Sequence, residues 1–319
     1  MKSGHNVRII PRLDIKGPNL IKGLAFEGNR VLGTPEYFAE TYYNEGADEL
    51  IFYDTVASLY QRNSLLEYIR KTAEKIFIPL TVAGGIRTIQ DIREILRAGA
   101  DKVAINTAAI ANPNLLKEAS RIFGSQCIVS CIEFHPWSRG RYEAWVDYGR
   151  QPTGVDALDW AKRVVDLGVG ELLLISVQRE GMGEGYDVEF TQQVSIQVPV
   201  PVIACGGAGK KEDFLEVIQV GKANAVSAAS VFHYHYAKPV SSLWMSFNEA
   251  RLRMGAQIDS GNIDFLKYGH GEYCEIMTDK IAIPSLKEYL KENNISIRPS
   301  ALQGQPSQVN GNGKGLEAL

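Results

Sequence analysis

Two segments of this chain repeat one another, and the repeat limits the fold more than any other feature of the sequence. Residues 80–110 and 201–232 align without gaps, so that Gly84 falls on Gly206. Each segment has the pattern of a buried strand, a Gly-Gly turn, an amphipathic helix, a second buried strand and a short polar turn. A chain that contains this unit twice is expected to consist of two equivalent halves.

The two glycine pairs, Gly84-Gly85 and Gly206-Gly207, are candidate phosphate sites. Glycine after a strand lets backbone N–H groups approach an anion closely, and the helix that follows adds a favourable dipole. The turns that end the two segments also match, at Asn106-Thr107 and Ala228-Ala229. Two matched sites suggest a ligand with a phosphate at each end. The alternative is that both are ordinary turns that use glycine for its geometry.

The rest of the chain alternates short apolar runs with helical patterns. Eight runs are predicted to be strands: Val7–Leu13, Glu49–Tyr53, Pro79–Val82, Lys102–Ile105, Cys127–Ile132, Glu171–Ile175, Pro201–Cys205 and Ala223–Ala228. The predicted helices are Pro35–Glu45, Leu65–Lys75, Ile89–Ala98, Asn114–Phe123, Ala157–Leu167, Glu189–Val194, Glu212–Val220 and Ile283–Asn294. This alternation predicts an α/β fold, a (β/α)8 TIM barrel built from two half-barrels, with function at the carboxyl ends of the strands.

The length of 319 residues fits one such barrel. We expect the barrel to occupy residues 1–298, interrupted by an inserted, aromatic-rich segment at 234–281. Residues 299–319 are rich in Gly, Gln, Asn and Ser and are expected to be a disordered tail.

Composition excludes several classes of function. The net charge is −3 and no long basic run occurs, so a nucleic-acid partner is not expected. No apolar stretch approaches a membrane span and the first residues lack a signal segment, so we expect a cytoplasmic protein. The cysteines and histidines are scattered, and no nicotinamide or flavin motif occurs, so neither a metal nor a cofactor is predicted.

Carboxylates end two strands at equivalent places in the halves. Asp14 ends the first predicted strand and Glu133 ends the fifth. Two carboxyl groups at opposite strand tops suit general acid and base catalysis on a ligand that lies across the barrel mouth. The alternative is that both are solvated acids that follow strands.

Four charged residues stand at or near the starts of strands, at the opposite end of the barrel: Arg8, Glu49, Lys102 and Glu171. Alternate strands contribute to one layer of a barrel interior, so several of these charges are expected to meet near the axis. Charges buried there must pair, because an unpaired buried charge costs several kcal/mol.

Several motifs together resemble a known family. The stretches RIIPRLDIK, DELIFYDTVAS, LTVAGGI, GADKVAINTAAI, CGGAGK and AASVFHY are similar, in order and spacing, to the cyclase subunit of imidazole glycerol phosphate synthase. The likeness covers residues 8–236 and returns at 283–298. It implies a (β/α)8 lyase of histidine biosynthesis that receives ammonia from a glutaminase partner. The ammonia is joined to a bisphosphate ribonucleotide, giving imidazole glycerol phosphate and an aminoimidazole carboxamide ribotide.

The resemblance also implies roles for individual residues. Asp14 matches the family's first catalytic aspartate, Lys22 the lysine of a mobile loop that folds over substrate, and Asp54 a polar residue at the top of the second strand. One phosphate is expected on Gly84, Gly85, Asn106 and Thr107, and the other on Gly206, Gly207, Ala229 and Ser230. The ring of Arg8, Glu49, Lys102 and Glu171 is implied to gate the ammonia entrance, with a purely structural ring of ion pairs as the alternative.

Departures from the family pattern cluster at the rim of the barrel. Glu133 stands where the family has its second catalytic aspartate, and Arg12 stands where a small residue is usual. The family motif S-x-D-R-D-G-T reads SVQREGM here, at residues 176–182. These changes leave a second hypothesis open, in which the barrel conducts ammonia to a sugar amidotransferase of surface polysaccharide synthesis, docked through 234–281. A third hypothesis is a non-catalytic phosphate-binding scaffold.

Overall fold

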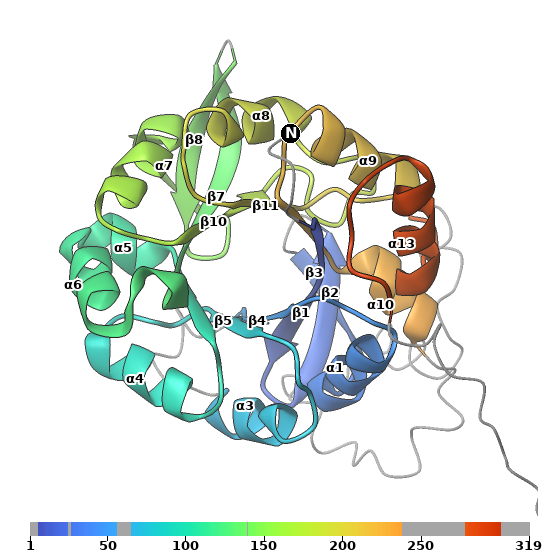
Figure 1. Ribbon diagram of the computed structural model, residues 1–319. Coiled ribbons are helices and arrows are strands. Elements are labelled where there is room, and N and C mark those ends of the chain that lie inside the picture. The colour runs from blue at the N-terminus through green and yellow to red at the C-terminus, as the bar shows by residue number, and fades with distance from the viewer. Residues whose placement is uncertain (1–5, 25–26, 56–64, 139, 238–277, 301–319) are drawn as a thin grey trace, which may run out of the picture.

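Eight parallel strands form a closed barrel inside a ring of helices (Figure 1). The computed structural model describes residues 6–24, 27–55, 65–138, 140–237 and 278–300. The barrel strands are β1 (Arg8–Lys16), β4 (Leu50–Asp54), β5 (Leu80–Ala83), β6 (Lys102–Ile105), β7 (Ile128–Ser138), β10 (Glu171–Ser176), β11 (Val202–Cys205) and β12 (Ala225–Ala228). Each pairs with the next, and β12 pairs with β1 to close the ring. The predicted TIM barrel is confirmed.

The helices follow the strands as the sequence predicts. They are α1 (Pro35–Asn44), α3 (Leu66–Ala73), α4 (Ile89–Arg97), α6 (Asn114–Phe123), α7 (Ala157–Asp166), α8 (Val188–Ser195), α9 (Lys211–Gln219) and α13 (Ile283–Glu292). Two short helices, α5 (Thr107–Ala111) and α10 (Ser230–Tyr236), stand where the sequence predicts only polar turns. The inserted segment lies mostly outside the described residues and the tail almost wholly so, and the domain division therefore stays a prediction.

The two copies of the repeat fold alike. Helices α4 and α9 begin and end at positions 122 residues apart in the sequence. Gly84 and Gly206, the first glycines of the two turns, both have φ of +92°. Only glycine adopts this conformation readily, so the same backbone geometry is required at both turns. The duplication seen in the sequence is thus a duplication of structure.

Two antiparallel extensions of the barrel strands were missed by the sequence analysis. A hairpin of β2 (Asn19–Leu24) and β3 (Glu27–Gly33) pairs with the end of β1. A second pair, β8 (Arg141–Val146) and β9 (Gln151–Asp156), continues from β7, and this extension projects beyond the ring of helices (Figure 1). Lys22 therefore lies on a strand rather than in an irregular loop.

Side chains of each barrel strand alternate between two apolar regions. On β1, Ile9 and Leu13 pack outward against the helices, in the large core between the strands and the helix ring. Ile10 points inward and belongs to a separate cluster inside the barrel, with Ile51, Leu173 and others. The same alternation directs Arg8, Arg12 and Asp14 into the barrel interior.

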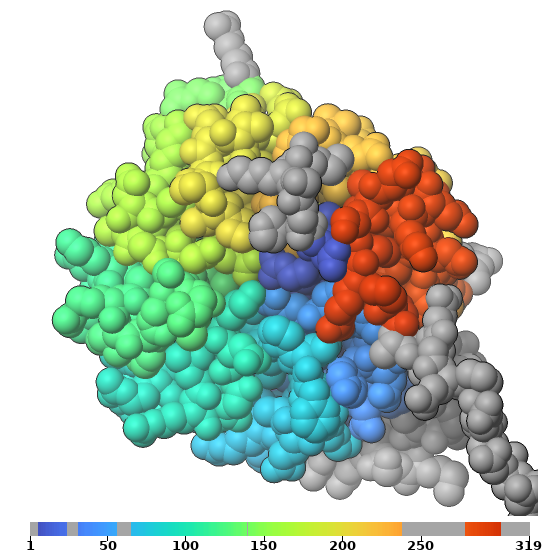
Figure 2. Space-filling model, in the orientation of Figure 1, coloured from blue at the N-terminus to red at the C-terminus, as the bar shows by residue number. Residues whose placement is uncertain are grey.

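Asp48 fastens the last helix to the first strand. Its carboxylate accepts from the backbone N–H of Ile9 at 2.8 Å, from Lys287 of α13 at 2.7 Å and from Arg298 at 3.0 Å. Burial lowers the pKa of Lys287, and Asp48 opposes that shift. Beside this cluster Val7 and Ile297 form a β-bridge, and Figure 2 shows the red C-terminal segment meeting the dark-blue start of β1 there.

Asp48→Ala is expected to lower the free energy of unfolding by about 3–5 kcal/mol, because it leaves the ammonium group of Lys287 buried without its partner. The control is Glu40→Ala, which removes a surface ion pair to Lys75 and is expected to cost less than about 1 kcal/mol. Urea unfolding followed by circular dichroism measures both. Equal losses would show that Asp48 does not fasten α13.

Candidate active site at the barrel mouth

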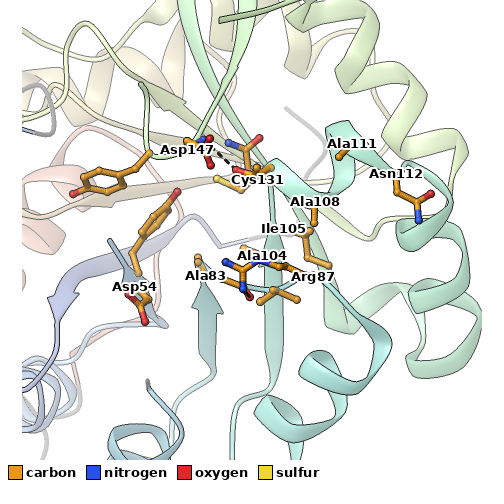
Figure 3. Close-up of a pocket in the computed structure, with 17 residues that line it drawn as sticks. Asp54, Ala83, Arg87, Ala104, Ile105, Ala108, Ala111, Asn112, Cys131 and Asp147 are labelled. Carbon is orange, nitrogen blue, oxygen red and sulfur yellow. Dashed lines mark hydrogen bonds between the residues drawn. The ribbon is translucent and has the colours of Figure 1, made fainter. Parts of the chain in front are cut away.

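A cavity of about 370 Å³ opens at the carboxyl ends of β4, β5 and β6. Its lining includes Asp54, Gly84, Gly85, Asn106 and Thr107, which the sequence analysis had assigned to one phosphate site and its surroundings. Figure 3 shows Asp54 and Ala83 on one side of this cavity, and Cys131 and Asp147 on another. Arg87, which the sequence analysis did not single out, also lines it and adds a cationic group.

Local contacts explain why Gly84, Asn106 and Thr107 occupy their positions beside the cavity. A Cβ atom on Gly84 would lie 2.3 Å from the carbonyl oxygen of Asp54, so only glycine fits beside the end of β4. The side-chain amide of Asn106 donates to the carbonyl of Trp145 at 3.0 Å. The hydroxyl oxygen of Thr107 accepts from the backbone N–H of Asp147 at 3.1 Å. Asn106 and Thr107 thereby hold the turn after β8 beside the cavity.

The second glycine turn has different surroundings. Gly206, Gly207, Ala229 and Ser230 are buried and do not line this cavity. A Cβ atom on Gly206 would lie 3.2 Å from a carboxylate oxygen of Glu180, and Gly207 accepts from the N–H of Gly185 at 2.8 Å. The segment after β10 therefore packs directly on the second turn, and the two turns do not share one open cavity.

Arg12 lies between two carboxylates at the mouth. It donates through Nε and Nη2 to Asp14, both at 2.9 Å, and through Nη1 and Nη2 to Glu180, at 3.1 and 2.8 Å. Lys22, from the β2–β3 hairpin, pairs with Glu180 and lies 3.4 Å from Asp14. We call Arg12, Asp14, Lys22 and Glu180 the mouth quartet. Each of its members is at most 3% exposed.

The mouth quartet contains two cations and two carboxylates, and this balance lets it remain buried. Burial alone would raise the pKa of Glu180, but Arg12 and Lys22 outweigh that effect and lower it to about 2. Burial disfavours the charge on Arg12, yet Asp14 and Glu180 raise the pKa of this guanidinium well above its ordinary value. All four groups are therefore bound into one network that also ties the β2–β3 hairpin to the barrel.

Glu133 has a different environment from Asp14. It is fully buried, its Oε1 accepts from the hydroxyl of Tyr53, and its Oε2 accepts from the N–H of Gly149 at 2.7 Å. Burial raises its pKa to about 7, although Tyr53, Gly149 and Arg12 each act to lower it. A carboxyl group with this pKa exists in both protonation states near neutral pH, as a general acid or base requires.

At the other end of the interior, the four residues predicted from strand starts meet in a ring. Arg8 donates to Glu49 at 2.8 Å and also pairs with Glu171. Lys102 lies 3.0 Å from Glu49 and 2.8 Å from Glu171. We call this ring the floor quartet. Thr81 adds a hydrogen bond to Glu49 at 2.6 Å.

Three residues of the site had weak or ambiguous signals in the sequence. Arg12 and Glu180 stood out as departures from the family pattern, but nothing in the sequence showed that they contact each other. Tyr53 gave no signal, because an aromatic residue at the end of an apolar strand is usual in a core. None of the helices in the described part of the chain has an apolar stretch that could span a bilayer.

Arg12→Leu is expected to lower the free energy of unfolding by about 3–5 kcal/mol, because Asp14 and Glu180 then share only Lys22. Adding Glu180→Gln restores the charge balance, so the double variant is expected to be at least about 2 kcal/mol more stable than the sum of the two single losses. A double-mutant cycle by urea unfolding measures this coupling. Additive losses would contradict the pairing.

Comparison with known proteins agrees with this arrangement. A family model described as a histidine biosynthesis protein matches residues 8–238. The imidazole glycerol phosphate synthase subunit HisF of Legionella pneumophila is 56% identical over 209 residues, 66% of this chain and 99% of the relative. The HisF subunit of Alkaliphilus metalliredigens is 45% identical over 247 residues (77% and 98%), and that of Methanocaldococcus jannaschii is 46% identical over 250 residues (71% and 90%). The chain belongs to the family of histidine biosynthesis proteins that includes the HisF subunits of imidazole glycerol phosphate synthase.

Proposed function

We propose that this chain catalyses the cyclase reaction of imidazole glycerol phosphate synthase in histidine biosynthesis. In this reaction ammonia is joined to a bisphosphate ribonucleotide, and the products are imidazole glycerol phosphate and an aminoimidazole carboxamide ribotide. The observation that carries the proposal is the identity of 45–56% to HisF subunits over 90–99% of their length. These relatives do not favour the alternative of a subunit that only supplies a sugar amidotransferase.

The two glycine turns support a substrate with two phosphates. One phosphate is proposed to bind in the open cavity, on Gly84, Gly85, Asn106 and Thr107, where Arg87 adds positive charge. The other is proposed to bind on Gly206, Gly207, Ala229 and Ser230. Since Glu180 packs on that turn, binding there requires the segment after β10 to shift and frees Arg12 and Lys22 to face the incoming anion.

Two carboxyl groups support the acid–base chemistry of ring closure. Glu133 is proposed to exchange a proton with the substrate, because its pKa of about 7 suits transfer in either direction near neutral pH. Asp14 is proposed as the base at the other side of the mouth, where Arg12 and Lys22 orient its carboxylate. Lys22 and Asp54 are proposed to contact the substrate from the hairpin and from the end of β4.

The interior supports delivery of ammonia from a separate glutaminase subunit. The floor quartet stands at the strand starts, and an apolar layer separates it from the mouth. This layer includes Ile10, Ile51, Ala83, Ala104, Val129, Leu173, Ile203 and Ala225. Neutral ammonia loses less on leaving water than a charged molecule does, so an apolar route favours it over ammonium. The floor quartet is proposed to gate the entrance to this route.

The purified chain, supplied with ammonium salt and the bisphosphate ribonucleotide, is expected to form imidazole glycerol phosphate. Glu133→Gln is expected to lower kcat by about 100-fold or more, because it removes the titrating carboxyl group. Glu143→Gln is the matched control and is expected to retain activity, because the Glu143 carboxylate accepts from the N–H of Gly154 and does not line the mouth cavity. Chromatographic detection of the product measures all three proteins. Absence of product from the wild-type chain would reject the proposed function.

Lys102→Glu is expected to uncouple the glutaminase partner from the cyclase reaction. The change places a third carboxylate beside Glu49 and Glu171 and breaks both ion pairs of Lys102. Glutamine-driven product formation is expected to fall about tenfold or more, while the rate with added ammonium salt stays within about twofold. The ratio of the two rates in the reconstituted complex is the measurement. An unchanged ratio would remove the gate assignment.

A further inference from the structure

We propose that Tyr53 is a positioning residue for Glu133, whose carboxyl group it fixes from a strand three places away around the barrel. The catalytic role of Glu133 in this proposal rests on the proposed function. The contact between Tyr53 and Glu133 can be tested by a titration that needs no enzyme activity.

Tyr53 spans the barrel interior to reach Glu133. It stands on β4, whereas Glu133 stands on β7, and strands β5 and β6 lie between them in the sheet order. Its hydroxyl donates to Oε1 of Glu133, while the N–H of Gly149 donates to Oε2. Both carboxylate oxygens therefore have a donor, and the donors approach from different elements. This fixes the direction in which the carboxyl group points.

Tyr53 is itself held in place from other elements. The guanidinium carbon of Arg12 lies 5.7 Å from the centre of its ring, and the ring of Tyr148 lies 5.6 Å away at 51°. Tyr53 is only 5% exposed. Because Arg12 is bound to Asp14 and Glu180, the ring of Tyr53 connects the mouth quartet to Glu133. The two proposed acid–base groups, Asp14 and Glu133, are thus positioned by one packed unit.

This contact matters because Glu133 has one more rotatable bond than an aspartate. A longer side chain reaches more positions, and a misplacement of about 1 Å costs on the order of 100-fold in rate. Tyr53 and Gly149 remove that freedom by binding both oxygens. A phenylalanine at 53 would keep the ring but leave Oε1 without this donor.

The hydroxyl of Tyr53 also affects the protonation of Glu133. The groups that face this carboxyl group are Tyr53 from β4, Arg12 from β1, Cys131 on its own strand, and Asp147, Tyr148 and Gly149 from the turn after β8. A donor to the charged form favours ionisation, so loss of the Tyr53 hydroxyl raises the pKa of Glu133 further. Whether Glu133 acts as acid or base, its limb of the pH–rate profile moves to higher pH.

The test is Tyr53→Phe. We expect kcat to fall about 10- to 100-fold, KM to change less than about threefold, and the limb of the pH–rate profile due to Glu133 to move up by about one pH unit. The matched control is Tyr142→Phe, which removes another buried hydroxyl that donates to a carboxylate, Asp187 at 3.1 Å. It is expected to leave both kcat and the profile unchanged. A purely structural role for Tyr53 would lower activity without moving the limb.

A second measurement needs no turnover. Glutamate labelled with ¹³C at its side-chain carboxyl is titrated by NMR, and the signal of Glu133 is identified by its loss in Glu133→Gln. The midpoint is expected to rise by about one pH unit in Tyr53→Phe and to stay in place in Tyr142→Phe. If Tyr53→Phe does not fold, Tyr53→Met, which fills the space with a flexible apolar chain, replaces it. If the wild-type chain shows no turnover while the midpoint still rises in Tyr53→Phe, the proposed function is rejected and the contact is supported. An unshifted midpoint would overturn the inference.

Discussion

Buried charge must be balanced by opposite charge, and this requirement organises the interior of the barrel. On β1, alternate residues point inward, and two of them are arginines. Arg8 is neutralised in the floor quartet, and Arg12 in the mouth quartet. Between the quartets the interior is apolar. In each quartet an arginine of β1 pairs with a carboxylate at the start of β10 or after its end, and β1 and β10 are not neighbours. The same ion pairs that neutralise the charges therefore also hold the barrel ends together.

The balance at the mouth also affects the proposed chemistry. Arg12 and Lys22 engage Asp14 and Glu180, so in the proposed function a substrate phosphate competes with these carboxylates for the same cations. Glu133 stands apart from these ion pairs, and burial leaves it with a pKa of about 7. Glu180 and Glu133 thus differ in pKa, because Glu180 is paired with cations whereas Glu133 is held by neutral donors.

The sequence predicted the barrel well because its signals are local and repeated. The fold can be predicted from the strand and helix periods, the glycine turns and the positions of the strand starts. The same signals predict that the charges of the floor quartet meet. The mouth was harder to predict. The contact between Arg12 and Glu180 joins residues 168 positions apart and depends on the reach of two long side chains. Tyr53 resembled a core residue because its polar contact is a single hydroxyl at the far end of an apolar ring.

The distribution of charge between the half-barrels has one further consequence. In each quartet the first half of the chain supplies two cations and one carboxylate, and the second half supplies the remaining carboxylate, Glu171 or Glu180. Two first halves placed face to face would bury surplus positive charge at both ends, whereas a first and a second half neutralise each other. Although the two halves share one backbone plan, their charges therefore favour pairing of each half with its counterpart over pairing with a copy of itself.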